Sequence, residues 1–188
     1  MTRLLTSVSA VLVALAGCAP VPISSKVYAP NPADAVPVQG GGSGCMMNNA
    51  KSVANRQIGT ADVRVSLWAS PPEQAKPHAT VDVQILQRKK LGPIQSVRIN
   101  PGRIRLEEGG KSYAPATRKT HNNTNADYGL QFNGAYVTFP SPTGNAEAAR
   151  VVFQPGAITI GGRAVDFAPI RFTRTTEVAI YLFPCIPA

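Results

Sequence analysis

The chain has 188 residues, about one domain with an additional segment, and 44% of them are hydrophobic, which excludes wholesale disorder. Glycine (16) and proline (17) are both abundant, and this disfavours a helical protein and favours short strands joined by turns. The formal net charge is +9, but basic residues occur as doublets such as Lys89-Lys90, which are too short for a polybasic motif.

An apolar run from Leu4 to Leu15 follows Arg3 and ends at Ala16-Gly17-Cys18. It is too short to span a bilayer, which takes about 20 apolar residues, and it has the charge, length and small final residues of a secretory signal. The sequence Leu15-Ala16-Gly17-Cys18 resembles the lipobox of bacterial lipoproteins. This resemblance implies a signal peptide over 1–17 and a lipid on Cys18. The alternative is an ordinary signal peptide with an incidental cysteine.

The same resemblance implies a location. Residue 19 is Ala rather than Asp, which in the enterobacterial sorting rule implies the outer membrane. The domain is then expected to face the periplasm or the cell surface, with the bilayer as a partner through acylated Cys18. Nucleic acid is not expected as a partner of an exported protein.

Residues 18–44 are predicted to be a lipidated, flexible and disordered tether. Five prolines restrain this segment to extended shapes, and residues 40–44 read Gly-Gly-Gly-Ser-Gly. The glycine cluster lacks the lysine of a phosphate-binding loop, so it is interpreted as a hinge.

Residues 45–188 are predicted to form an all-β domain, because apolar residues alternate with polar ones over many short segments. The expected architecture is a β-sandwich with an immunoglobulin-like arrangement, and a small barrel is the alternative. The inward residues begin with Val63, Val65 and Leu67 and end with Val178, Ile180 and Leu182. By the same alternation, Asp62, Asp82 and Asp166 are predicted to face outward, and Glu107-Glu108 to lie in a solvated turn.

Residues 114–127 are the longest polar stretch of the domain and are predicted to be a surface loop that caps one end of the sandwich. Loops of this length are often functional. The candidate binding residues are Arg118, Lys119, His121, Asn122 and Asn123. A solvated loop histidine is the default interpretation of His121, and a catalytic role is the alternative.

The chain has three cysteines. If Cys18 carries a lipid, Cys45 and Cys185 remain, in a compartment where disulfides form. A bridge between them closes a loop of about 140 residues, for which the chain-entropy model gives roughly 4–5 kcal/mol as an upper guide. Two reduced, buried thiols are the alternative, and a copper(I) site at Cys45-Met46-Met47 is a third.

No catalytic triad, glycosidase carboxylate pair or calcium loop can be recognised from spacing, so no cofactor and no metal is predicted. The leading hypothesis is a non-enzymatic, lipid-anchored envelope protein that binds or scaffolds another envelope component through the 114–127 loop or a sheet edge. A surface adhesion or glycan-binding module is the second hypothesis. An envelope hydrolase is the third, and it predicts loss of activity in a His121→Ala variant that still folds.

Overall fold

The computed structural model describes residues 20–39, 46–47, 51–69, 78–125, 129–140 and 146–182. The predicted signal peptide and the three cysteines, Cys18, Cys45 and Cys185, lie outside the described residues, and so does the 40–44 glycine cluster. Within the described ranges, no helix has the length and apolar character needed to cross a bilayer.

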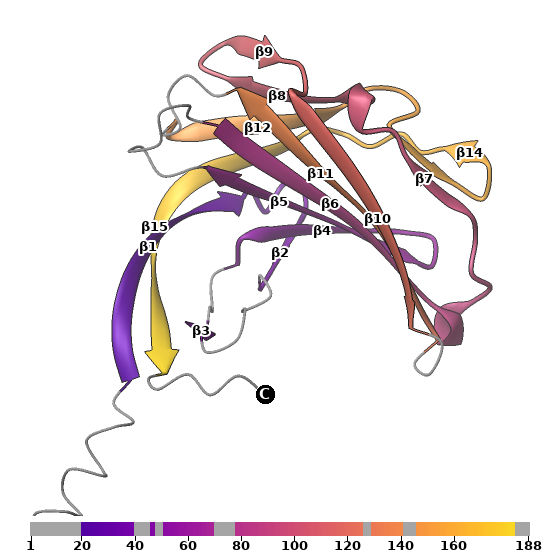
Figure 1. The fold of residues 1–188 in the computed structure, drawn as a ribbon, viewed down its shortest axis with the longest axis horizontal. Helices are drawn as coiled ribbons and strands as arrows, with labels where there is room; N and C mark the ends of the chain where they lie inside the picture. Colours follow the sequence, from indigo (N-terminus) through magenta and orange to yellow (C-terminus); the bar gives the residue numbers. More distant parts are fainter. Residues whose placement is uncertain are drawn as a thin grey trace, which may run out of the picture.

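The described residues form two six-stranded sheets and one three-stranded sheet, and every strand pairing among them is antiparallel (Figure 1). Sheet A has the order β1-β15-β12-β8-β9, with β3 paired to β15. Its strands are β1 (Pro20–Pro30), β3 (Met46–Met47), β8 (Ile104–Glu108), β9 (Lys111–Tyr113), β12 (Ala148–Phe153) and β15 (Ile170–Leu182).

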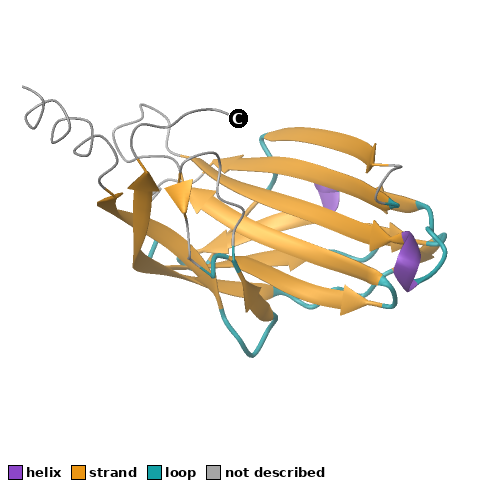
Figure 2. Ribbon diagram, turned by 90° about the horizontal axis from the view of Figure 1, so that it is seen from below, coloured by secondary structure: helices purple, strands orange, loops and turns teal. Residues whose placement is uncertain are grey.

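Sheet B has the order β10-β11-β6-β5-β4-β2. Its strands are β2 (Val36–Val38), β4 (Val53–Ile58), β5 (Ala61–Ala69), β6 (His78–Arg88), β10 (Thr117–Asn125) and β11 (Leu130–Pro140). The small sheet C contains β7 (Val97–Ile99), β13 (Ile158–Ile160) and β14 (Arg163–Ala164). Two short 3-10 helices, η2 (Lys89–Leu91) and η3 (Pro101–Arg103), lie in connections between strands (Figure 2).

One hydrophobic core holds the three sheets together. The predicted inward residues of β5, Val63, Val65 and Leu67, are at most 1% exposed. They share one cluster with Leu106 and Phe172 of sheet A and with Ile158 of sheet C. Because the central strands of the sheets direct one face to this core, the all-β sandwich predicted from the sequence is confirmed. Its immunoglobulin-like character stays a prediction.

The prediction of a flexible tether is wrong over residues 20–39. Strand β1 pairs with β15 along its whole length, from Pro20 opposite Leu182 to Pro30 opposite Phe172, and β2 pairs with β4. Proline is tolerated here because β1 is an edge strand, where a missing N–H is not needed on the solvent side. Tyr28 anchors the strand: it is 6% exposed, and its hydroxyl donates to the Ala146 carbonyl over 2.8 Å.

The prediction of a surface loop at 114–127 is also wrong over most of its length. Residues 117–125 form β10, which pairs residue by residue with β11 and lies at the edge of sheet B. Most of its side chains are exposed, on either side of the strand. An edge strand with two solvated faces has no alternation of apolar and polar residues, and this is the signal on which the strand prediction depended.

Two acidic residues, one predicted to lie in a solvated turn and one predicted to face outward, are buried. Glu108 belongs to the end of β8 and is 7% exposed, and the turn begins only at Gly109 and Gly110, which have φ of 57° and 77°. Asp82 is 3% exposed although it points away from the core. By contrast, Asp166 is exposed as predicted.

Candidate binding face on sheet B

Five side chains on β5, β6, β10 and β11 lie on the face of sheet B that is turned away from the core. Tyr136 lies directly opposite Asp82, and Gly134 is the partner of both Gln84 and His121. Their chain neighbours Val81, Val83 and Val137 are fully buried in the core, so alternation directs residues 82, 84 and 136 to the other side. We call this surface the aromatic face; its residues are Trp68, Asp82, Gln84, His121 and Tyr136.

Two large aromatic side chains are open to solvent on the aromatic face. Trp68 is 48% exposed and Tyr136 is 37% exposed. Their ring centroids are 6.4 Å apart with an interplanar angle of 30°, and His121 stacks on Tyr136 at 5.0 Å and 23°. The three rings therefore form a continuous series across β5, β11 and β10, which supplies apolar area with few rotatable bonds.

Gly134 gives His121 its position. A Cβ atom at residue 134 would overlap Cε1 and Nε2 of the His121 ring, so the imidazole occupies the space left by the missing side chain. This arrangement fixes the ring against β11 and next to Tyr136. Covering a strand glycine by a cross-strand aromatic ring is a known way to stabilise a sheet.

Asp82 is a buried carboxylate with one unused oxygen. Its Oδ2 accepts a hydrogen bond from Gln84 Nε2 at 2.6 Å, whereas Oδ1 has no partner among the described residues. Burial raises the pKa of Asp82 to about 6, and the Gln84 hydrogen bond and the charge of His121 offset only part of this effect. The negative charge of Asp82, together with burial, raises the pKa of Tyr136. The carboxylate is thus largely ionised at neutral pH and retains capacity to accept a hydrogen bond.

Further polar atoms on the same side of sheet B lack partners. Asn55 and Arg64 lie opposite each other on β4 and β5, and Arg64 is opposite Gln84 on β6. Within the described part of the chain, Asn55 Oδ1, Arg64 Nε and His121 Nδ1 are buried without a hydrogen-bond partner. Buried polar atoms are nearly always paired in native proteins, so this concentration distinguishes this side of sheet B from the apolar core.

The five candidate residues predicted from sequence all lie on β10, but the strand divides them between two sides. Lys119, His121 and Asn123 are opposite Tyr136, Gly134 and Phe132, and lie on the side of the aromatic face.

The other two candidates lie on the reverse side of β10. Arg118 extends over η3, where its Nη1 is 3.3 Å from the position of a Cβ at Gly102. Asn122 lines a separate hollow of about 160 Å³ together with Thr120 and Asn133. The predicted set is therefore not one cluster.

Four residues of the aromatic face were not predicted as site residues: Trp68, Asp82, Gln84 and Tyr136. Alternation with Leu67 already places Trp68 on the solvent side of its strand, and an outward tryptophan is a signal that the sequence contains. The proximity of Asp82 to Tyr136 depends on the pairing of β6 with β11, which are more than 40 residues apart in the chain, and no sequence pattern reveals it.

Comparison with known proteins gives no match: no family model, no curated protein and no solved structure is similar to this chain. Among the described residues, no group of three His, Cys, Asp or Glu side chains is arranged to hold a metal ion.

Proposed function

We propose that this protein is a lipid-anchored envelope protein whose β-sandwich binds another envelope component, without catalysis, through the aromatic face. Acylated Cys18 would hold it in the outer membrane, with the domain facing the periplasm or the cell surface. The anchor rests on the lipobox resemblance at Leu15-Ala16-Gly17-Cys18.

The observation that supports binding is the position of Asp82 beside two exposed aromatic rings. A buried carboxylate with an unused oxygen lowers the free energy of unfolding at neutral pH, and residues of this kind are concentrated at functional sites. Trp68 and Tyr136 next to it supply the aromatic area that is enriched at the centre of interfaces. Together they offer one polar anchor surrounded by apolar surface.

A glycan is the second candidate for the bound component, and the composition of the face favours it. Sugar rings present C–H faces that pack on aromatic rings, and their hydroxyls both donate and accept hydrogen bonds. Such a ligand would pack on the exposed rings of Trp68 and Tyr136, beside the polar side chains of the same face. Lys119 on the same side of β10 would favour an acidic glycan, and that contribution weakens as salt is raised.

The test of binding is a pull-down from the protein's own envelope with matched variants. We expect the double variant Trp68→Ala/Tyr136→Ala to lose a component that the unmodified protein retains. Leu91→Ala is the control, because Leu91 is 46% exposed on η2, away from the aromatic face. Equal retention by the unmodified protein and the double variant would contradict the proposal. Salt-sensitive retention, competed by an acidic polysaccharide, would identify the component as a glycan.

The test of the anchor is independent of binding. Cys18→Ser should release the protein from membranes, and inhibition of the lipobox peptidase should leave a larger precursor. A Cys18→Ser protein that still sediments with membranes and has the mass of the unmodified protein would contradict lipidation at this residue.

A further inference from the structure

A second candidate site combines residues of sheet A and sheet B, and none of them belongs to the aromatic face. Arg56 of β4, Arg150 of β12 and Arg171 of β15 line one hollow of about 420 Å³, together with Asp34 of the β1–β2 turn. This volume falls within the range of about 300–1,000 Å³ that is usual for small-molecule sites. Three positive charges and one negative charge therefore border the same space.

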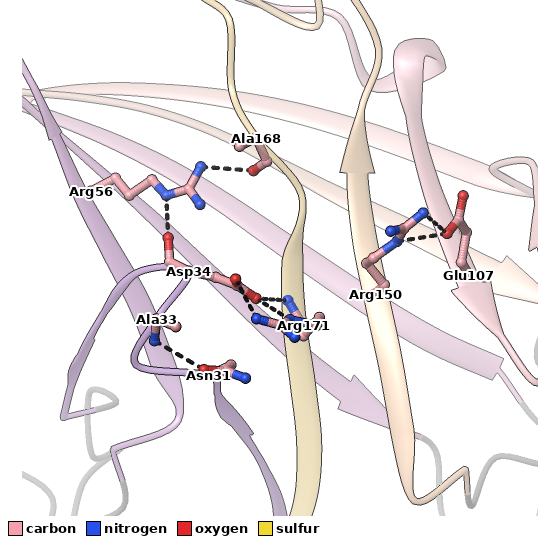
Figure 3. A network of polar contacts seen from close by, with 8 residues as sticks. All are labelled: Asn31, Ala33, Asp34, Arg56, Glu107, Arg150, Ala168 and Arg171. Atoms are coloured by element: carbon pink, nitrogen blue, oxygen red, sulfur yellow. Dashed lines mark hydrogen bonds and ion pairs between the residues drawn. The ribbon is translucent and has the colours of Figure 1, made fainter.

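Arg150 and Arg171 are direct cross-strand partners, an arrangement that places two like charges side by side. Each is held from its far side by a carboxylate. Arg171 Nε and Nη2 donate to Asp34 Oδ2 and Oδ1 at 2.8 and 2.9 Å. Arg150 Nε and Nη2 lie 2.7 and 2.6 Å from Glu107 Oε2. Figure 3 shows the two guanidinium groups turned toward these carboxylates.

Arg56 enters the hollow from the other sheet. Its Nε donates to the Asp34 carbonyl at 2.6 Å and its Nη1 to the Ala168 carbonyl at 2.7 Å (Figure 3). Its guanidinium also lies 4.8 Å from the centre of the Phe167 ring. Burial lowers the pKa of Arg56, and the charge of Asp34 opposes that effect. The arginine is thus fixed in place while its charge is incompletely compensated.

Each of the three guanidinium groups retains one terminal nitrogen that has no hydrogen-bond partner in the described part of the chain. These are Arg56 Nη2, Arg150 Nη1 and Arg171 Nη1. Asp34, whose pKa the Arg171 hydrogen bonds lower to about 2, stays ionised, and together with Glu107 on Arg150 it leaves one of the three positive charges uncompensated. We propose that this arginine hollow binds a phosphate monoester, to which the three free guanidinium nitrogens donate.

A phosphate monoester fits the arginine hollow better than a carboxylate does. The donors come from three different strands, which suits a tetrahedral acceptor with several oxygens better than a planar carboxylate, and the one positive charge that Asp34 and Glu107 leave uncompensated favours an anion. Guanidinium groups recognise phosphate through directed hydrogen bonds as well as through charge. The phosphate group can belong to a soluble metabolite or to a lipid headgroup.

The test is a calorimetric titration of the full chain in detergent with three probes: inorganic phosphate, water-soluble dihexanoyl phosphatidic acid, and acetate. We expect inorganic phosphate to bind and acetate not to bind. Tighter binding of phosphatidic acid than of inorganic phosphate would assign the site to a lipid headgroup, whereas equal or weaker binding would assign it to a soluble ester. Stronger binding of acetate, or no phosphate binding up to about 10 mM, would overturn the proposal.

Two variants of one ion pair separate ligand binding from a structural role. Arg150→Gln removes a proposed donor and should weaken phosphate binding about fivefold or more, because hydrogen bonds to charged groups are among the stronger ones. Glu107→Gln breaks the same ion pair but frees Arg150, and should leave phosphate binding unchanged or tighter. If both variants weaken binding equally, Arg150 does not contact the ligand. Arg163→Gln, on the exposed β14 strand, controls for the loss of one positive charge.

Discussion

The imidazole of His121 occupies the space in which a side chain at residue 134 would lie, so that the histidine on β10 and the glycine on β11 form a matched pair. His121 in turn stacks on Tyr136, one of the two exposed aromatic rings of the aromatic face. The backbone of β11 at residue 134 has no positive φ, so only the histidine ring opposes a larger residue there.

Gly134→Ala should therefore destabilise the protein through a clash rather than through backbone strain. We expect a loss of about 1–3 kcal/mol in the free energy of unfolding, as for other overpacked sites. In a His121→Ala background the same change should be neutral or stabilising, because alanine suits a strand better than glycine. Urea unfolding of the four proteins of this double-mutant cycle measures the coupling. Equal losses in both backgrounds would mean that the ring can move aside freely.

Asp82→Asn should stabilise the protein at neutral and higher pH. The pKa of Asp82 is raised from 3.8 to about 6 on folding, so its favourable contribution is complete below about pH 4 and is lost as the pH rises through about 6. The loss is at most about 3 kcal/mol, and the asparagine variant should not show it. Denaturant unfolding between about pH 4 and pH 8 measures both profiles.

Asp166→Asn serves as the control for this experiment, because Asp166 is exposed. It should follow the pH profile of the unmodified protein. If the Asp82→Asn profile also coincides with that of the unmodified protein, then the carboxylate is solvated and its role on the aromatic face is lost.

The Asp34–Arg171 pair predicts the opposite pH dependence. The hydrogen bonds from Arg171 lower the pKa of Asp34 from 3.8 to about 2, so the stabilisation is present above about pH 4 and is lost as the pH falls through about 2. Because the Arg171 side chain is 57% exposed, we expect Asp34→Asn to cost only about 1 kcal/mol or less at neutral pH. Thermal unfolding at pH 7 and near pH 3 should show a difference between the two proteins that shrinks in acid.

A disulfide between Cys45 and Cys185 predicts sensitivity to reducing agents. Both residues lie outside the described part of the chain. Reduction should lower the melting temperature of the oxidised protein, because the bridge would close a loop of about 140 residues. A Cys45→Ser/Cys185→Ser variant should melt at the same temperature with and without reductant. No shift in the unmodified protein would mean that the thiols are free.

Strands that turn one side to the core could be predicted from sequence, and strands at sheet edges could not. The alternation of Val63, Val65 and Leu67 identified β5 because burial selects apolar residues on one face. For β10 and β1, hydrogen bonding to one neighbour is enough to fix the strand, so polar residues and prolines remain compatible with it.

In the candidate site, too, some residues could be predicted from the sequence and others could not. His121 and Lys119 were predicted as binding residues because they belong to a long polar stretch, and both lie on the side of the aromatic face. Asp82 was predicted to face outward, and it does, but its burial could not be predicted because alternation indicates direction and not what surrounds an outward side chain. Proximity between distant strands, such as Asp82 beside Tyr136, is created by register alone.

The pairing of β1 with β15 changes how an anchored protein would be oriented. Strand β1 begins at Pro20, two positions after Cys18, and its eleven residues extend over roughly 36 Å at the usual rise per residue. In Figure 1 this pair forms a curved arm that extends beyond the rest of the sandwich. If Cys18 carries the lipid, the paired strands β1 and β15 connect the membrane anchor to the sandwich through a hydrogen-bonded ribbon instead of a flexible chain. The domain would then stand at a restricted height and tilt instead of diffusing freely around its attachment point.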